Sequence, residues 1–126
     1  MNFFTVSLFG HRVVYDMQHV GDALIPLVRE LLRTKAHVVF LVGRNGGFDE
    51  YVASLIKQER KNTDKENCDV TLVLPYKVAD MEYYEKYYAE MIIYESDEKP
   101  RPKRAIAKRN RWLVDQADLE IAHPEK

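Results

Sequence analysis

Three glycines separate a β-rich run from a helical pattern in the stretch "VVFLVGRNGGFDEYVASLI" at 38–56. Glycine enters positive φ values freely and lets backbone amides approach another group closely, and Gly43, Gly46 and Gly47 therefore predict an open turn. An amide-rich turn that leads into the N-terminus of a helix suits an anion, and a phosphate above all. The spacing matches neither the dinucleotide fingerprint G-x-G-x-x-G nor the P-loop, and a plain tight turn is the alternative.

A second polar turn follows the first β-rich run, in "FGHR" at 9–12. Gly10 permits close approach, His11 supplies an imidazole, and Arg12 supplies a forked guanidinium that suits a phosphate. The alternative is that His11 packs or caps and that Arg12 is a solvated surface charge. Because ligands of parallel sheets bind beyond the carboxyl ends of the strands, we expect both turns to lie at one edge of the sheet.

Two carboxylates follow the glycine-rich turn. Asp49 stands where the next helix begins, so it can cap that helix or bind a ribose hydroxyl. Glu50 could serve as a catalytic acid, but a carboxylate in the first turn of a helix is also favoured by the helix dipole, and we prefer that interpretation.

The order of β-rich runs and helical patterns predicts the architecture that positions these residues. Continuous β-branched runs alternate with apolar residues spaced three and four apart, which predicts right-handed crossovers and a parallel sheet. The fold class is therefore α/β, a three-layer Rossmann-like fold with a mainly parallel sheet of about five strands and helices on both faces. The predicted strands are 4–9, 37–43, 69–76, 92–94 and 118–123.

The helices between these strands follow from apolar spacing. The apolar residues between Val20 and Leu32 are spaced three and four apart, so they lie on one face of a helix. Pro26 either lies in the first turn of a helix that starts near Asp22 or kinks a longer helix. Further helices are expected after the glycines, over 81–91 and over 105–116. The helix expected over 81–91 places four large side chains on one face, for which packing is a better explanation than base stacking. They are Tyr84, Tyr87, Tyr88 and Met91.

Composition limits the kind of protein. A chain of 126 residues with 46% hydrophobic content fits a single domain, 1–126, and a net charge of −1 argues against a dedicated duplex-DNA binder. The single cysteine, Cys68, permits no intrachain disulfide and no metal quartet, so we expect a semi-buried thiol, a cytoplasmic location, no metal and no cofactor. No targeting segment and no apolar run of about 20 residues is evident, so no membrane partner is expected.

A basic run near the end of the sequence offers a different class of function. It could follow the backbone of single-stranded nucleic acid, but Trp112 is the only aromatic residue nearby, and a solvated helix face is the favoured interpretation. Its members are Lys99, Arg101, Lys103, Arg104, Lys108, Arg109 and Arg111.

Four stretches, in this order, resemble the SLOG superfamily of Rossmann-like nucleotide-binding proteins: "TVSLFGHR", "GRNGGFDEYVA", "LVLPY" and "RNRWLVDQADLEIAH". The similarity runs from residue 4 to about residue 123. Within that superfamily the chain is most similar to small uncharacterised bacterial and phage proteins related to the Lonely Guy phosphoribohydrolases and to the DNA-processing DprA proteins.

The resemblance implies a nucleotide or nucleotide-derived ligand at the carboxyl ends of the strands. It also implies that Trp112 packs its helix on the sheet rather than touching the ligand. The residues that it places around the ligand are Gly10, His11, Arg12, Gly43, Gly46, Gly47, Asp49, Arg109, Asn110 and Asp115.

The sequence departs from the family pattern in two ways. The P-G-G-x-G-T-x-x-E motif of the phosphoribohydrolases is absent, and a second glycine-rich turn with its helix does not follow "EIAHPEK". We therefore favour ligand binding for sensing or regulation over an N-glycosidase that acts on nucleoside monophosphates, with a nucleic-acid or protein interaction module as a third alternative. An uncovered sheet edge near the C-terminus, or the tyrosine-bearing helix, is expected to form a homodimer interface.

Overall fold

The computed structural model of the protein describes residues 3–9, 16–43, 47–63, 66–76, 79, 81–88, 90–93 and 102–122. Strands and helices alternate along the described chain. The strands are β1 (Phe4–Phe9), β2 (Val38–Val42), β3 (Cys68–Leu74), β4 (Glu90–Ile93) and β5 (Leu119–Ala122). The helices are α1 (Met17–Thr34), α2 (Gly47–Lys61), α3 (Met81–Tyr87) and α4 (Pro102–Gln116).

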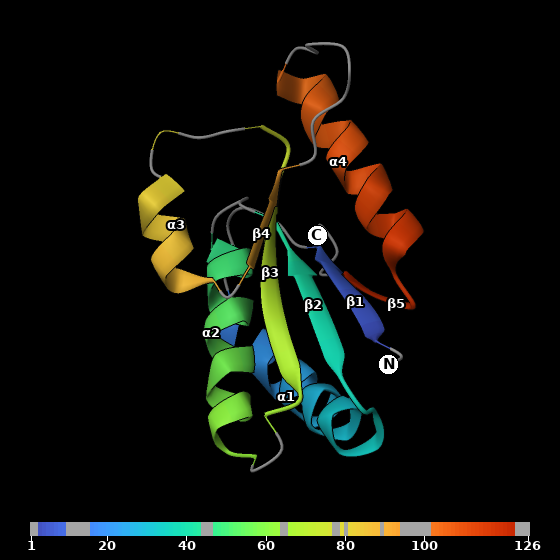
Figure 1. The fold of residues 1–126 in the computed structure, drawn as a ribbon. Helices are drawn as coiled ribbons and strands as arrows, with labels where there is room; N and C mark the ends of the chain where they lie inside the picture. The colour runs from blue at the N-terminus through green and yellow to red at the C-terminus, as the bar shows by residue number, and fades with distance from the viewer. Residues whose placement is uncertain are drawn as a thin grey trace.

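The five strands form one sheet in the order β4-β3-β2-β1-β5, and every neighbouring pair is parallel. Figure 1 shows α1, α2 and α3 on one side of this sheet and α4 on the other. Right-handed crossovers explain this division, because the chain steps outward from β1 to β4 and then returns to the opposite side of β1 to form β5. The prediction of a three-layer α/β fold with a parallel five-stranded sheet is confirmed.

Helix α1 resolves the two alternatives that Pro26 left open. The helix is 18 residues long, begins at Met17 and contains Pro26 in its interior, so the start near Asp22 is wrong. Asp16 caps the helix, because its carboxylate accepts a hydrogen bond from the His19 amide at 3.0 Å. Proline removes one helical hydrogen bond, and its exposed position here leaves the freed carbonyl on the side that faces water.

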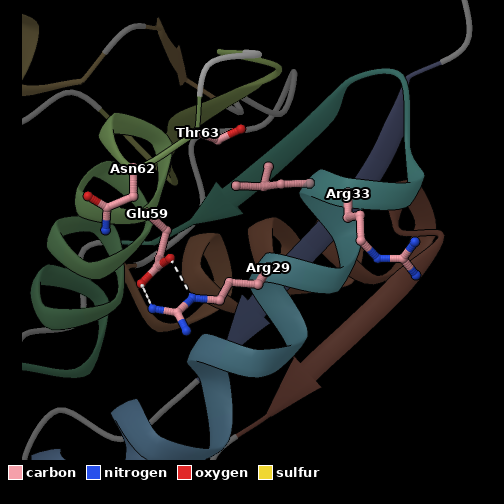
Figure 2. Close-up of a pocket in the computed structure, with 6 residues that line it drawn as sticks. Arg29, Arg33, Glu59, Asn62 and Thr63 are labelled. Atoms are coloured by element: carbon pink, nitrogen blue, oxygen red, sulfur yellow. Dashed lines mark hydrogen bonds and ion pairs between the residues drawn. The ribbon is translucent and has the colours of Figure 1, made fainter.

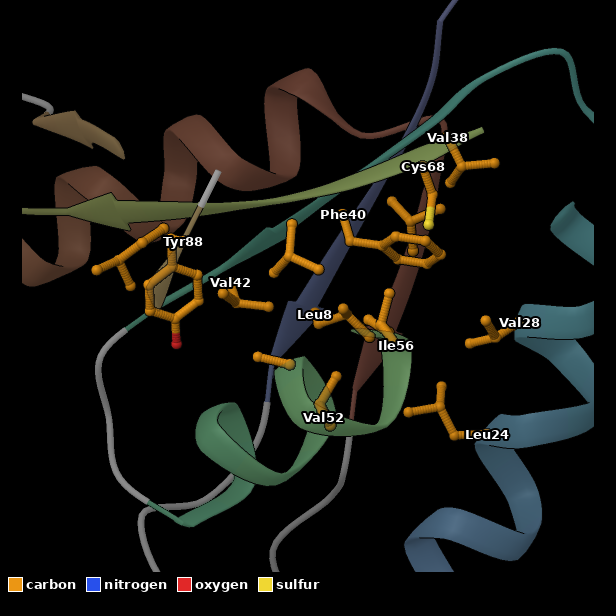
Figure 3. Packing of buried hydrophobic residues seen from close by; sticks show 14 of the residues in the cluster. Leu8, Leu24, Val28, Val38, Phe40, Val42, Val52, Ile56, Cys68 and Tyr88 are labelled. Atoms are coloured by element: carbon orange, nitrogen blue, oxygen red, sulfur yellow. The ribbon is translucent and has the colours of Figure 1, made fainter. Parts of the chain in front are cut away.

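The larger hydrophobic core lies between the sheet and the helices α1, α2 and α3 (Figure 3). Phe40 and Ile56 are fully buried in it, and Cys68, which starts β3 opposite Val38, is fully buried as well. The expectation of a semi-buried Cys68 is therefore wrong, because the inner side of the amino end of β3 is covered by this core.

The tyrosine-bearing helix is shorter than expected. Tyr84 and Tyr88 are buried in the larger core, which confirms that these side chains pack. The helix α3 ends at Tyr87, however, and Met91 belongs to β4, so a helix over 81–91 is wrong. Two adjacent strand residues, Ile92 and Ile93, favour extended backbone there, as β-branched residues generally do.

A smaller core lies under α4, on the opposite face of the sheet. Leu113 of α4 is buried against Leu41 and Val73, and Trp112 packs at the margin of this cluster, as predicted. The hydroxyl of Ser7 in β1 also donates a buried hydrogen bond of 2.7 Å to the carbonyl of Leu113. Helix α4 is therefore held on the sheet by apolar contacts and by at least one buried polar bond.

Candidate functional site at the carboxyl ends of β2 and β3

The candidate site begins where β2 ends. Gly43 follows Val42 and is buried, and α2 starts at Gly47 on the same edge of the sheet. The first turn of α2 carries Asp49, whose exposed fraction is only 3%. A carboxylate is electrostatically favoured at this end of a helix, which helps to explain why the charge is tolerated there.

Arg109 reaches this edge from α4, on the opposite face of the sheet. It is 1% exposed and is one of the largest fully buried side chains of the described protein. Its Nη1 donates a hydrogen bond of 3.0 Å to the carbonyl of Val73, and its Nε donates one of 2.9 Å to Oδ1 of Asn110. Arg109 stands one helical turn before Leu113, so both side chains lie on the sheet-facing side of α4.

Gly43 makes room for this arginine. A Cβ atom added at Gly43 would lie 2.9 Å from Nη1 and 3.2 Å from Cζ of Arg109. The backbone φ of Gly43 lies outside the left-handed region, so positive φ is not the reason for glycine at this position. The required feature is the close approach of the guanidinium to the backbone.

Burial lowers the pKa of the Arg109 guanidinium, and the nearby Asp49 and Tyr76 oppose this shift. Arginine remains protonated at neutral pH in proteins, so the site contains a buried positive charge. Asp49 supplies a negative charge close to it. A buried cation and a buried carboxylate thus lie together at the carboxyl edge of the sheet, where α/β proteins bind their ligands.

Four of the residues predicted from the sequence meet here: Gly43, Asp49, Arg109 and Asn110. Gly47 begins α2 at the same edge. Among the predicted residues, Gly10, His11, Arg12 and Gly46 lie outside the residues that the structure describes.

Asp115 lies away from this group. It is exposed and lies six positions after Arg109 in the same helix, which corresponds to about 9 Å along the axis. The helix runs toward the amino end of the sheet, where Asp118 accepts a hydrogen bond of 2.8 Å from the amide of Thr5. Asp115 therefore belongs to the half of α4 that leads away from the candidate site.

Tyr76 is a member of the site that the sequence did not single out. It follows the end of β3 by two residues, is 39% exposed and lies near enough to Arg109 to affect the pKa of that guanidinium. The "LPY" sequence after a buried strand was its only signal, because a lone tyrosine after a proline has no characteristic spacing.

The described side chains of the basic run do not all lie on one surface, and Lys99, Arg101 and the side chain of Lys103 are outside the described part of the chain. Arg109 is buried, whereas Arg104 and Arg111 are exposed and Lys108 is half-buried. The run therefore contains one residue of the candidate site, Arg109, which lies on the sheet-facing side of α4. Arg104 and Arg111 are surface charges on its exposed side.

No family model matches the chain, and no curated protein matches it. The geometry of the described residues is therefore what defines the site. Within these described ranges, no group of three or more histidine, cysteine, aspartate or glutamate side chains could hold a metal ion. No helix in the part of the chain that the structure describes is long and apolar enough to cross a membrane.

A separate cavity of about 400 Å³ lies between α1 and α2, near their C-terminal ends (Figure 2). Arg29 binds the buried Glu59 through two hydrogen bonds, of 2.9 and 3.3 Å. Figure 2 shows the Arg33 guanidinium directed away from this pair, and Arg33 is itself paired with Glu30. The charged groups that line the cavity are already matched with partners, so we do not assign a ligand to it.

Proposed function

We propose that the protein binds a nucleotide or a nucleotide-derived ligand at the carboxyl ends of its parallel strands, as a sensor or regulatory module. The observation that carries this proposal is the burial of Arg109 over Gly43, beside the buried Asp49. Buried charges destabilise a fold unless they are compensated, and a site with buried charges and a perturbed pKa at a sheet edge is a candidate ligand site.

The chemistry of the edge suits the parts of a nucleotide. Gly43 lies just beyond β2 and Gly47 begins α2, and the amides and dipole at the N-terminus of α2 favour a phosphate. Asp49 is a hydrogen-bond acceptor for ribose hydroxyls, and we propose that Arg12 of the neighbouring "FGHR" turn adds a phosphate contact. Arg109 holds the backbone of this edge in place through Val73 and adds positive potential.

We favour binding over turnover because the two described carboxylates of this edge, Asp49 and Glu50, can be explained without a catalytic role. Glu50 is exposed in the first turn of α2, where the helix dipole already accounts for it. Asp49 is buried beside Arg109, and we propose that it accepts hydrogen bonds from a ligand rather than donating a proton.

We also propose that the chain is SLOG-like, which its motif order and fold support, and that it is a cytoplasmic protein that forms a homodimer. The outer strand β5 pairs with β1, and its other edge is a surface on which a second copy could add. Tyr84 and Tyr88 are buried within the chain, so β5 is the better candidate of the two predicted interfaces. Light scattering at tens of micromolar should give twice the mass of one chain; a monomer with protected amides in residues 119–122 would contradict this.

Calorimetry with the four common nucleoside 5′-monophosphates tests the main proposal. We expect at least one to bind to the native chain and expect Arg109→Met to bind it at least tenfold more weakly. Arg111→Ala is the matched control, because it removes an exposed arginine from the same helix and should leave affinity unchanged. Circular dichroism would establish that Arg109→Met remains folded.

Three results would overturn or replace the proposal. Absence of binding by every nucleotide would remove it. Release of free base, detected by chromatography, would favour the N-glycosidase alternative. Salt-sensitive binding of single-stranded oligonucleotides that is lost with the exposed Arg104 and Arg111 would favour the nucleic-acid alternative.

A further inference from the structure

Tyr76 is an aromatic side chain at the carboxyl edge of the sheet, and it does not belong to the larger hydrophobic core. It is 39% exposed, whereas Tyr84 and Tyr88 are buried. Tyr83 is exposed but makes an edge-to-face contact with Tyr84, with ring centroids 5.2 Å apart. Tyr76 makes no ring contact with another residue in the described part of the chain, and its side chain is partly accessible to a ligand.

The position of Tyr76 relative to Arg109 follows from the chain itself. The carbonyl of Val73 accepts a hydrogen bond from Arg109, and Tyr76 is three residues further along, beyond the end of β3. Strand β2 is the neighbour of β3 in the sheet, and Gly43 lies directly beyond its end. Tyr76 and Gly43 therefore lie beyond the ends of adjacent strands, and both are near the Arg109 guanidinium.

We propose that Tyr76 is the platform on which the base of the bound nucleotide stacks. The inference rests on the proposed function and deepens it, because it restricts the ligand to molecules that carry a base. A ribose phosphate without a base would use the turn and Asp49 but not Tyr76. Stacking on an aromatic ring tolerates every base, since each has a π-face, so Tyr76 contributes affinity and leaves discrimination among bases to other groups.

The alternative role for Tyr76 is polar. Its hydroxyl could serve Arg109 alone, since Tyr76 lies near enough to affect the pKa of the Arg109 guanidinium. Phenylalanine keeps the ring and removes the hydroxyl, whereas alanine removes both. Comparison of Tyr76→Phe with Tyr76→Ala therefore separates stacking from a purely polar role.

The experiment measures the affinities of the native chain, Tyr76→Phe and Tyr76→Ala for the four nucleoside 5′-monophosphates and for ribose 5-phosphate. We expect Tyr76→Ala to weaken the best-bound nucleotide by roughly 5- to 150-fold, the range typical of one base stacked on an aromatic ring. Tyr76→Phe should bind it as the native chain does. Ribose 5-phosphate should bind equally to all three proteins, and more weakly than the nucleotide to the native chain.

Each other outcome overturns the inference in a recognisable way. If the native chain binds nucleotides and Tyr76→Ala binds them equally well, stacking is wrong while the proposed function stands. If Tyr76→Phe loses as much affinity as Tyr76→Ala, the hydroxyl is the important group and stacking is again wrong. If Tyr76→Ala weakens ribose 5-phosphate as much as the nucleotide, its effect does not involve the base. If the native chain binds no nucleotide, the proposed function fails and the inference fails with it.

Discussion

The guanidinium of Arg109 occupies the space that a side chain on Gly43 would need, with Nη1 2.9 Å from the position of a Cβ atom. The two residues come from different layers of the molecule, one from the end of β2 and the other from the helix on the far face of the sheet. The contact between them couples the packing of α4 to the shape of the end of β2. A substitution at either residue should therefore change the packing around the other.

Gly43→Ala should lower the free energy of unfolding by about 1–3 kcal/mol, because the added methyl group overpacks against a buried guanidinium that is fixed by two hydrogen bonds. Urea denaturation measures this. In an Arg109→Ala background the methyl group has room, so the same substitution should cost much less there. Equal costs in both backgrounds would show that the contact between the two residues does not limit packing.

Ser7→Ala should lower the free energy of unfolding by about 1–2 kcal/mol, because it removes a buried hydrogen bond between β1 and α4 and leaves the Leu113 carbonyl without that donor. Thr34→Ala is a suitable control, since the Thr34 hydroxyl donates to the Glu30 carbonyl on an exposed helix surface. The control should change stability by less than about 0.5 kcal/mol. Similar decreases in the free energy of unfolding for both variants would mean that the Ser7 hydrogen bond stabilises the fold no more than an exposed one does.

Gly47→Val should abolish nucleotide binding and leave the helical content unchanged. Gly47 is the first residue of α2, and a β-branched side chain both restricts the backbone there and fills the space above the amides. Calorimetry gives the affinity, and circular dichroism gives the helical content. Glu50→Ala alters an exposed residue in the same turn and should bind as the native chain does. Native affinity in Gly47→Val would exclude this turn from the site.

The stability of the folded chain should decrease above pH 9 in a way that depends on Cys68. Burial raises the pKa of the Cys68 thiol from 9.0 to about 11. The folded state therefore holds its proton more tightly than the unfolded state, so this contribution is fully present below pH 9 and is lost as the pH rises toward 11. The loss amounts to at most about 2–3 kcal/mol.

Comparison with Cys68→Ala isolates this effect from the titration of lysines and tyrosines, which both proteins share. Urea denaturation between pH 7.5 and 10.5 should show a smaller decrease of stability for Cys68→Ala than for the native chain. Parallel pH profiles would mean that the folded thiol titrates at its ordinary pKa.

The sequence predicted the sheet well because its signals were local. Continuous β-branched runs such as "HVVFLVG" have few alternatives to a buried parallel strand, and the first strand was predicted with the bounds that the structure shows. The start of α1 was missed because Pro26 drew attention to a later start, although Asp16 is an ordinary capping residue. The end of α3 was missed because tyrosine and methionine spacing continues into β4 without a break.

The site could be predicted only in part, because its members come from distant parts of the chain. Val73 and Arg109 are 36 positions apart, and no spacing rule joins them. The resemblance to a family placed Arg109 and Gly43 together, but it also included Asp115, which the rise of the helix carries away from the site. The resemblance did not explain why residue 43 is a glycine. The reason is that the guanidinium of Arg109, from the helix on the far face of the sheet, occupies the space of a Cβ atom.

The location of α4 has a consequence for the folding of the chain during its synthesis on the ribosome. The strands β1 to β4 and the helices α1 to α3 are all synthesised before α4, and together they cover only one face of the sheet. Until α4 emerges, the face that carries Leu41 and Val73 has no cover, and the side of β1 that receives β5 is an unpaired edge. Such surfaces attract other chains. The nascent chain should therefore be most dependent on chaperones just before α4 and β5 are translated, and the docking of these two elements should be the step that ends this dependence.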